Sequence, residues 1–289
     1  MQSGHAVHGD RHIRKADPLV GDRIVDVVVG MDSVGEFAAE EMEATVGRIV
    51  FPRYHHKITM KDLLEGAVKF QTKVYPEKRD LFTRLAAKQT PRALFITCAD
   101  SRVVPDMLTQ CEPGDLFICR NAGNIVPTYG GSAMGGVSAT IEYAVVALNI
   151  EHIVVLGHSD CGAMKGILHP DQVKHMPAVA SWLHHGDIAR LMVEENYPGL
   201  DERGQLTAII EENIIAQVEH LRTHPSVATR LARNKVSIHG WLYNIENGSL
   251  WAFDAEEGAF VPLDGRSSPS AVRRVRRKKD ADGTLAGGL

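Results

Sequence analysis

The stretch ALFITCADSR, residues 93–102, joins an apolar, strand-forming run to a cluster of polar side chains and decides the fold class. The run from Ala93 to Thr97 has the length of a strand, is partly β-branched and is bounded by polar residues. Similar runs begin at Leu116 and His152, and a helical pattern lies between those two. This order favours an α/β fold in which helices flank a central, mainly parallel β-sheet. We expect strands at 93–97, 116–119, 152–156, 236–243 and 249–253, and helices at 59–74, 178–195, 205–222 and around 141–148.

Thiol and imidazole side chains follow two of these strands. Cys98 comes at the end of the first run, His158 comes two residues after the third, and Cys161 follows three residues later. Because the carboxyl ends of neighbouring parallel strands meet at one edge of a sheet, we expect these side chains to converge. Two thiolates and one imidazole suit zinc, and three protein ligands with an open fourth position are typical of a catalytic site. The sequence therefore predicts a zinc enzyme.

Other polar groups lie beside the expected ligands. Asp100 and Arg102 come two and four residues after Cys98, and Gly162 opens a helix whose first N–H groups face outward and can bind an anion. A single cysteine at a strand end is usually a small buried apolar residue. The combination of three ligands with an adjacent carboxylate and guanidinium favours the metal site.

Other chemistries fit these residues less well. A cysteine nucleophile that handles phosphate needs a cradle closed by a more distant arginine, whereas Arg102 is only four residues from Cys98. Asp100, between them, would repel phosphate. A zinc finger needs close ligand pairs at both ends, and Cys98 has no near partner. The phosphate-binding pattern GxxxxGK[ST] is absent from the sequence.

The composition is ordinary for a globular enzyme. Of 289 residues, 44% are hydrophobic and 24% are charged. The near balance of 32 basic and 36 acidic residues gives no reason to expect a nucleic-acid partner. The longest apolar runs are too short to span a bilayer, and the first residues lack the apolar core of an export signal. We expect a cytoplasmic protein with no membrane association.

Three motifs together resemble those of β-class carbonic anhydrases: Cys98-Ala-Asp-Ser-Arg102, Arg120-Asn-Ala-Gly-Asn124 and His158-Ser-Asp-Cys-Gly162. The resemblance implies that Cys98, His158 and Cys161 bind one Zn²⁺ per subunit and that Asp100 and Arg102 form a catalytic dyad. It also implies the reaction of a carbonic anhydrase (carbonate dehydratase, a lyase): reversible hydration of CO2 to bicarbonate and a proton by zinc-bound hydroxide.

The resemblance further implies a shared substrate pocket. Gln89, Phe117 and Tyr129 match the pocket residues of the plant-type subgroup, in which the two aromatic residues come from the neighbouring subunit. Gly162 is the fourth residue expected to bind CO2 or bicarbonate. The chain is therefore expected to form a homodimer or a homotetramer.

The same comparison predicts an open site. In bicarbonate-regulated members, a tryptophan three residues before the first zinc cysteine joins an arginine and a tyrosine in a second bicarbonate pocket. Arg120 and Tyr143 match two of these residues, but Phe95 replaces the tryptophan and has no N–H to donate. We expect Asp100 to be paired with Arg102, rather than bound to zinc, near pH 7.5.

The resemblance extends from about Met60 to Asp264 and divides the chain into three parts. Residues 59–265 are the expected zinc-dependent catalytic domain, and residues 1–58 are an N-terminal extension, either regulatory or the result of a start codon assigned too early. Residues 266–289 form a basic, Gly-rich tail, expected to be disordered, with an anionic-surface or nucleic-acid patch as the alternative.

Two functional alternatives stay open at this point. A carbon disulfide or carbonyl sulfide hydrolase on the same scaffold would keep every metal ligand. A non-catalytic, zinc-bearing bicarbonate sensor would be expected to lose Asp100, Arg102 or Gln89, and all three are present.

Overall fold

The computed structural model describes residues 58–130, 135–265 and 269–271. The chain separates into two units, Met1–Thr59 and Met60–Leu289, and every described helix and strand belongs to the second. Apart from Ile58 and residues 269–271, the predicted extension 1–58 and tail 266–289 lie outside the described residues. Those domain boundaries therefore stay predictions.

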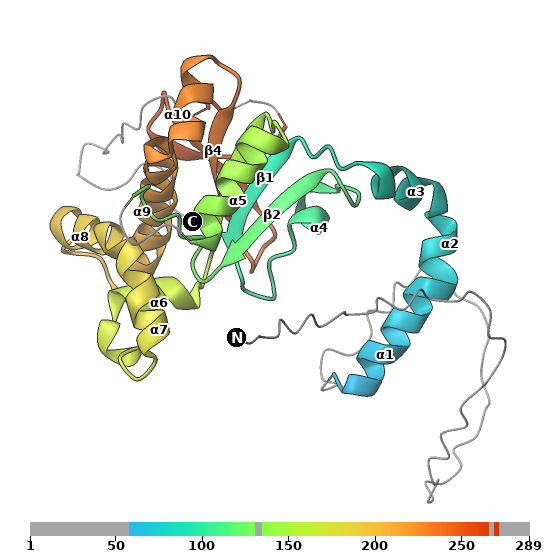
Figure 1. Ribbon diagram of the computed structural model, residues 1–289. Helices are drawn as coiled ribbons and strands as arrows, with labels where there is room; N and C mark the ends of the chain where they lie inside the picture. Colours follow the sequence, from blue (N-terminus) through green and yellow to red (C-terminus); the bar gives the residue numbers. More distant parts are fainter. Residues whose placement is uncertain (1–57, 131–134, 266–268, 272–289) are drawn as a thin grey trace, which may run out of the picture. The chain divides into compact units, whose positions relative to one another are not determined.

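A six-stranded sheet in the order β2-β1-β3-β4-β5-β6 organises the second unit (Figure 1). The first four strands pair in parallel, and the pairs β4–β5 and β5–β6 are antiparallel. The prediction of a mainly parallel sheet flanked by helices is confirmed. The strands are β1 Ala93–Cys98, β2 Leu116–Asn121, β3 His152–His158, β4 Ser237–Tyr243, β5 Leu250–Asp254 and β6 Ala259–Pro262.

The α-helices of the described residues vary from a single turn to 22 residues. Within those residues, no helix is both long and apolar enough to cross a membrane. The first helix continues as a π-helical segment at Phe70–Val74, and the fifth continues as another at Tyr143–Ala147. The helices are α1 Met60–Lys69, α2 Tyr75–Glu77, α3 Arg79–Ala87, α4 Pro105–Thr109, α5 Gly136–Glu142, α6 Gly162–Leu168, α7 Pro177–Leu183, α8 Asp187–Asn196, α9 Glu202–Thr223 and α10 Pro225–Ala232.

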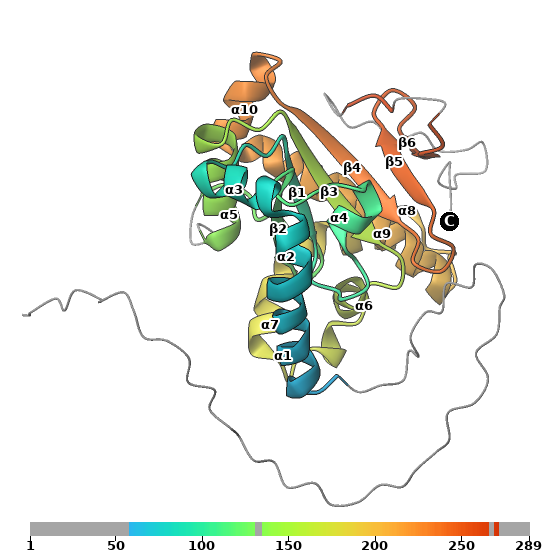
Figure 2. The same ribbon diagram turned by 90° about the vertical axis from the view of Figure 1, so that its right-hand side faces the viewer.

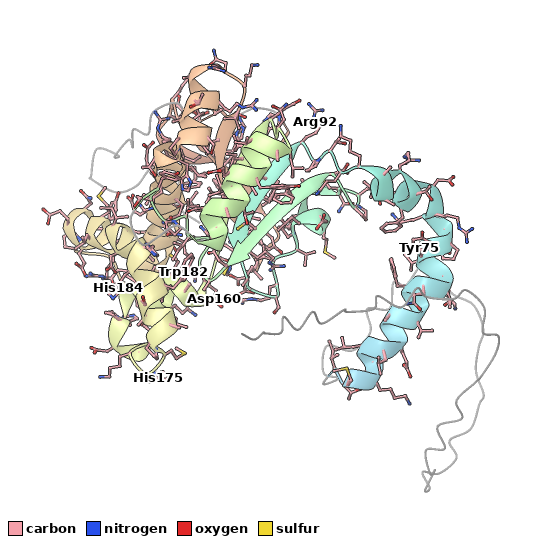
Figure 3. The ribbon with its side chains drawn as sticks, in the orientation of Figure 1. Tyr75, Arg92, Asp160, His175, Trp182 and His184 are labelled. Carbon is pink, nitrogen blue, oxygen red and sulfur yellow. The ribbon has the colours of Figure 1, made fainter. Side chains whose placement is uncertain are left out.

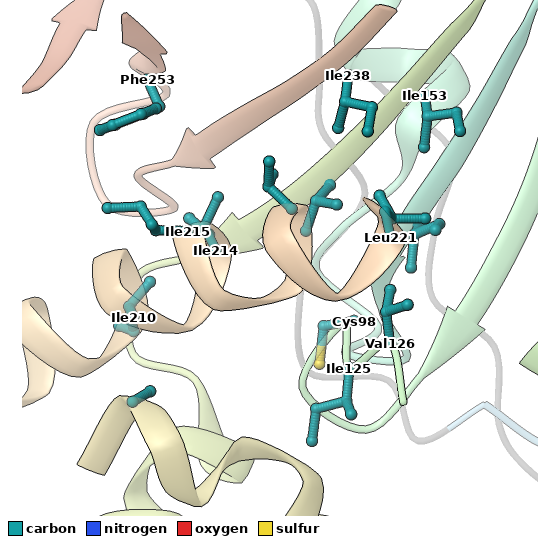
Figure 4. Packing of buried hydrophobic residues seen from close by; sticks show 14 of the residues in the cluster. Cys98, Ile125, Val126, Ile153, Ile210, Ile214, Ile215, Leu221, Ile238 and Phe253 are labelled. Atoms are coloured by element: carbon teal, nitrogen blue, oxygen red, sulfur yellow. The ribbon is translucent and has the colours of Figure 1, made fainter. Parts of the chain in front are cut away.

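The two faces of the sheet carry separate cores. The larger core lies on the face covered by α9, which packs against β3 and β4 (Figure 4). The smaller core lies on the other face, where α4 lies (Figure 2). Leu108 of α4 packs there on a cluster that includes Phe95 and Leu156. Both faces of β1 and β3 are covered, which explains why these strands are almost continuously apolar.

Helix α9 lies unusually close to the sheet. A Cβ atom at Gly157 or Gly240 would come within 2.7 Å of the Ile214 side chain, so only glycine allows this approach. The N-terminal end of α9 is capped by Asp201, whose carboxylate accepts the Gly204 N–H at 2.8 Å. The helix that carries several buried polar groups is therefore held tightly against the strands.

Two details differ from the sequence prediction. The single helix expected at 178–195 is two helices, α7 and α8, because the chain turns at Gly186, where a Cβ atom would lie 2.6 Å from the Ile167 side chain. Strand β6 and helices α3, α4 and α10 were not expected; each of them is shorter than ten residues. The expected helix at 59–74 is present as α1 and its π-helical continuation.

A histidine pair lies near the start of β4. Ser237 Oγ is 2.8 Å from His152 Nδ1 and 2.8 Å from His239 Nε2. Burial lowers the pKa of His239 to about 4, and the nearby His152 lowers it further than burial alone would. The imidazole of His239 is thus neutral in the folded protein above a pH of about 4.

We expect the folded state to lose stability as the pH falls from about 6.5 to 4, because His239 of the unfolded chain then binds a proton that the folded chain does not. Between pH 7.5 and 4.5, His239 should account for a decrease of about 2 kcal/mol in the free energy of unfolding, and this part of the decrease should be absent in His239→Gln. Urea unfolding of both proteins at the two pH values measures it. An equal acid loss in the two proteins would show that His239 does not contribute.

Candidate metal centre

The three predicted ligands meet at one edge of the sheet. Cys98 is the last residue of β1, and His158 is the last residue of the adjacent strand β3. Cys161 precedes the first residue of α6. Their ligand atoms all lie within 4.8 Å of one another, and all three residues are buried. The parallel pairing of β1 with β3 therefore brings residues sixty positions apart into one cluster.

The donor atoms fit a zinc ion. His158 Nδ1 lies 2.9 Å from the Ser159 carbonyl oxygen and donates to it, which leaves a lone pair on Nε2. That Nε2 atom is buried, and no described residue gives it a hydrogen bond. The Cys98 and Cys161 sulfurs are 4.0 Å apart. Two sulfurs about 2.3 Å from one tetrahedral zinc would be roughly 3.8 Å apart, so little movement is needed.

The two thiols have opposite acidities. The pKa of Cys98 falls well below its usual value, because Cys161 donates to its sulfur and because the Gly123 N–H adds a further hydrogen bond. The pKa of Cys161 rises, because its proton is shared with the Cys98 thiolate and because the residue is deeply buried. A divalent cation stabilises both thiolates and so removes this conflict.

Asp100 and Arg102 form a bidentate pair beside the ligands. Arg102 Nε donates to Asp100 Oδ1 at 2.9 Å, and Arg102 Nη2 donates to Asp100 Oδ2 at 2.8 Å. The guanidinium holds the pKa of the Asp100 carboxyl well below its usual range. Asp100 Oδ2 lies 3.9 Å from His158 Nε2, so an ionised carboxylate borders the metal-binding cluster.

The sequence analysis missed a second carboxylate on Arg102. Asp160, labelled in Figure 3, accepts from Arg102 Nη1 at 3.2 Å, and its backbone oxygen accepts from Arg102 Nη2 at 3.3 Å. Lys165 of α6 donates to the same carboxylate. The only signal in the sequence was the acidic residue between His158 and Cys161. Two acidic residues and one lysine thus fix the position of the Arg102 side chain.

Within one chain, Tyr143 does not lie with Phe95 and Arg120, the other two positions that correspond to the second bicarbonate pocket. The ring centroids of Tyr143 and Phe117 are 5.9 Å apart, whereas Phe95 packs edge-on against Trp241 with ring centroids 5.7 Å apart. Phe117 pairs with Leu94 and Phe95 with the next residue of β2, so the two phenylalanines face opposite sides of the sheet. Arg120 instead donates to the backbone oxygens of Cys98 and Asp100.

One chain does not bring Phe117 and Tyr129 to its own metal cluster. Gln89 precedes β1, and Phe117 pairs with Leu94, which is four residues and so roughly 13 Å before the cysteine at the end of that strand. The Tyr129 N–H donates to Thr223 in the last turn of α9. Gly162, in contrast, directly follows Cys161 and is exposed.

Comparisons with known proteins agree with this arrangement. A family model described as carbonic anhydrase matches residues 93–250. The carbonic anhydrase of Pseudomonas aeruginosa is 50% identical over 213 residues, which are 74% of this chain and 96% of that protein.

Solved structures are similar as well. The β-carbonic anhydrase CcaA is 45% identical with a TM-score of 0.70, covering 73% of this chain and 95% of that one. Tetrameric β-carbonic anhydrases of Sordaria macrospora are 29% identical with a TM-score of 0.59, covering 66% of this chain and 94% of the matched chain.

Proposed function

This chain belongs to the β-carbonic anhydrase family, and we propose that it catalyses the reversible hydration of CO2 to bicarbonate and a proton at the cluster of Cys98, His158 and Cys161. The observation that carries the proposal is the three-ligand cluster with an ionised carboxylate at its border. Three ligands leave a coordination position for solvent, as a hydrolytic or hydrating metal site requires.

Zn²⁺, one per subunit, is the proposed cofactor. When bound, it lowers the pKa of water toward neutrality and so supplies a nucleophile, as in carbonic anhydrases that hold zinc by three histidines. Two thiolates make a metal a weaker Lewis acid than imidazoles do. The surrounding residues of this chain therefore have more to contribute to orienting and deprotonating the reacting water.

Asp100 and Arg102 are the proposed catalytic dyad. The Asp100 carboxylate, next to the ligand atoms, accepts a hydrogen bond from the reacting water and orients its lone pair toward CO2. Arg102 keeps that carboxylate ionised and, by its planar bidentate fork, keeps it from binding the metal itself. Gly162, the first residue of α6, offers an N–H without an intrahelical partner to an oxygen of bicarbonate.

Stopped-flow CO2 hydration by the purified full chain tests the function. The protein as isolated should be active, lose activity when a chelator removes its metal, and regain it when stoichiometric zinc is returned. A zinc-loaded protein that does not accelerate the reaction over buffer would contradict the proposal.

We further propose that a second copy of the chain completes the substrate pocket with Phe117 and Tyr129, the two aromatic residues that the resemblance assigns to the neighbouring subunit. These residues lie far from the cluster within one chain, although they match pocket residues of the family. Helix α1 has no buried residue and exposes Leu63, Leu64 and Val68, an apolar face that a second copy can cover. A homodimer or homotetramer results, and the Sordaria relatives are described as tetrameric.

Co-expression of two inactive variants tests this sharing. Cys98→Ser lacks a metal ligand, and Phe117→Ala/Tyr129→Ala lacks the two aromatic pocket residues, of which Phe117 is partly buried and Tyr129 is exposed. In a mixed dimer, one site combines the intact cluster of one chain with the intact pocket residues of the other. Random pairing should restore about a quarter of wild-type activity. Activity no higher than that of the two variants alone would mean that the pocket residues do not act across subunits.

A further inference from the structure

The amide bond between Ala122 and Gly123 is hydrogen-bonded at both ends. Its N–H, on Gly123, donates to the Cys98 sulfur at 3.4 Å. Its carbonyl oxygen, on Ala122, accepts from the indole Nε1–H of Trp182 at 2.8 Å. Trp182 lies on α7 and is labelled in Figure 3. One planar amide therefore links an indole N–H to a sulfur of the metal cluster.

The position of this amide is tightly restricted. Gly123 has a φ of +81°, and a Cβ atom there would lie 2.9 Å from both the Ala163 and the Met164 side chains. The residue must be glycine, so it has no side chain with which to anchor itself. Contacts made by other elements must set the direction of its N–H.

The next amide is held from the opposite side by α9. Asn213 Nδ2 donates to the Gly123 carbonyl oxygen at 3.0 Å, and Gln217 Nε2 donates to Asn213 Oδ1 at 2.9 Å. Both side chains are almost completely buried. These bonds fix the backbone after Gly123, but they do not touch the amide that donates to Cys98. Among the described residues, Trp182 is the one whose side chain donates to the carbonyl oxygen of that amide.

Hydrogen bonding at the carbonyl end of an amide strengthens its N–H as a donor, by roughly 10–30% per bond in the condensed phase. An N–H that donates to a thiolate withdraws electron density from the sulfur. The thiolate then donates less charge to a metal ion, and the ion remains a stronger Lewis acid. With two thiolate ligands, the weak Lewis acidity of the metal limits the chemistry, and the hydrogen bond to the sulfur raises that Lewis acidity.

We propose that Trp182 is a positioning residue for the metal centre, acting through the Ala122–Gly123 amide to aim and polarise the N–H that bonds to the Cys98 sulfur. The proposal rests on the thiolate metal site of the proposed function. It assigns Trp182 no contact with substrate or with the reacting water.

Trp182→Phe tests the proposal, because it keeps an aromatic ring on α7 and removes the indole N–H together with part of the ring system. The matched control is Trp251→Phe, which removes another hydrogen-bonding indole N–H, donated to Ser249 Oγ at 3.2 Å on β5. Both full-length proteins are loaded with Co²⁺ for absorption spectroscopy and with Zn²⁺ for release to a chelator. Thermal unfolding of each reports any general loss of stability.

In Trp182→Phe, the thiolate-to-cobalt charge-transfer band should move to longer wavelength, because the Cys98 sulfur keeps more electron density. Zinc release should become about five- to tenfold faster, because the more basic sulfur is protonated more readily and the Gly123 N–H no longer holds it in position. Trp251→Phe should match wild type in both measurements. An unchanged band and release rate in Trp182→Phe, or equal changes in the two variants, would overturn the role of Trp182. A wild-type protein without any thiolate-to-cobalt band would overturn the metal site itself, and the role of Trp182 with it.

Discussion

Cys98→Ser, His158→Ala and Cys161→Ser should each purify with little zinc and should hydrate CO2 at least about a thousandfold more slowly than wild type. Each substitution leaves two protein ligands where three converge, and the neighbouring Asp100 carboxylate is held by its bidentate pair with Arg102. Elemental analysis of the purified proteins gives the zinc content, and stopped-flow measurement gives the rate.

Cys111→Ser is the matched control for the cysteine variants. Cys111 is partly buried, lies outside the metal cluster and donates weakly to the Thr109 carbonyl oxygen at 3.8 Å. It should keep stoichiometric zinc and near wild-type activity. Stoichiometric zinc in the three ligand variants would refute the assignment of the ligands.

Asp100→Asn should keep its zinc and hydrate CO2 at least about a hundredfold more slowly. The amide has the shape of the carboxylate but loses half of its acceptor capacity and the charge that Arg102 holds in place. Metal content separates this effect from a damaged site, and kcat measured with saturating CO2 reports the loss in the chemical step.

Asp160→Asn is the matched control for this variant. It also removes a carboxylate bonded to Arg102, at 3.2 Å, but one that is paired with Lys165 rather than bordering the ligand atoms. We expect a loss of less than about tenfold, because the bidentate pair of Arg102 with Asp100 remains. Near wild-type turnover of zinc-loaded Asp100→Asn would remove Asp100 from the mechanism.

Much of the fold was predictable because its signals are local. Strands β1 and β3 are buried on both faces, so a continuous apolar run marks each of them in the sequence, and the first residue of each was predicted correctly. The break between α7 and α8 was not predictable, because Gly186 must approach Ile167 of a different helix. No pattern within residues 178–195 indicates that contact.

The candidate site divides in the same way. Cys98, Asp100 and Arg102 lie within five consecutive residues, and His158 and Cys161 within four, so the donor types and their spacing are visible in the sequence itself. The sequence also contains Gln89, Phe117 and Tyr129. Their distance from the metal cluster, however, depends on which end of each strand they occupy and on the course of the loop along α9.

By itself, the sequence determined which chemical groups are available, which segments become strands, and that two short motifs meet at the carboxyl end of a parallel sheet. These properties follow from backbone preferences and from side chains a few residues apart. The tertiary structure alone decided that Trp182 reaches the amide bonded to Cys98 and that Asp160 shares Arg102 with Asp100. Such hydrogen bonds join residues about sixty positions apart, and their directions are set by the packing of α6, α7 and α9 rather than by any local pattern.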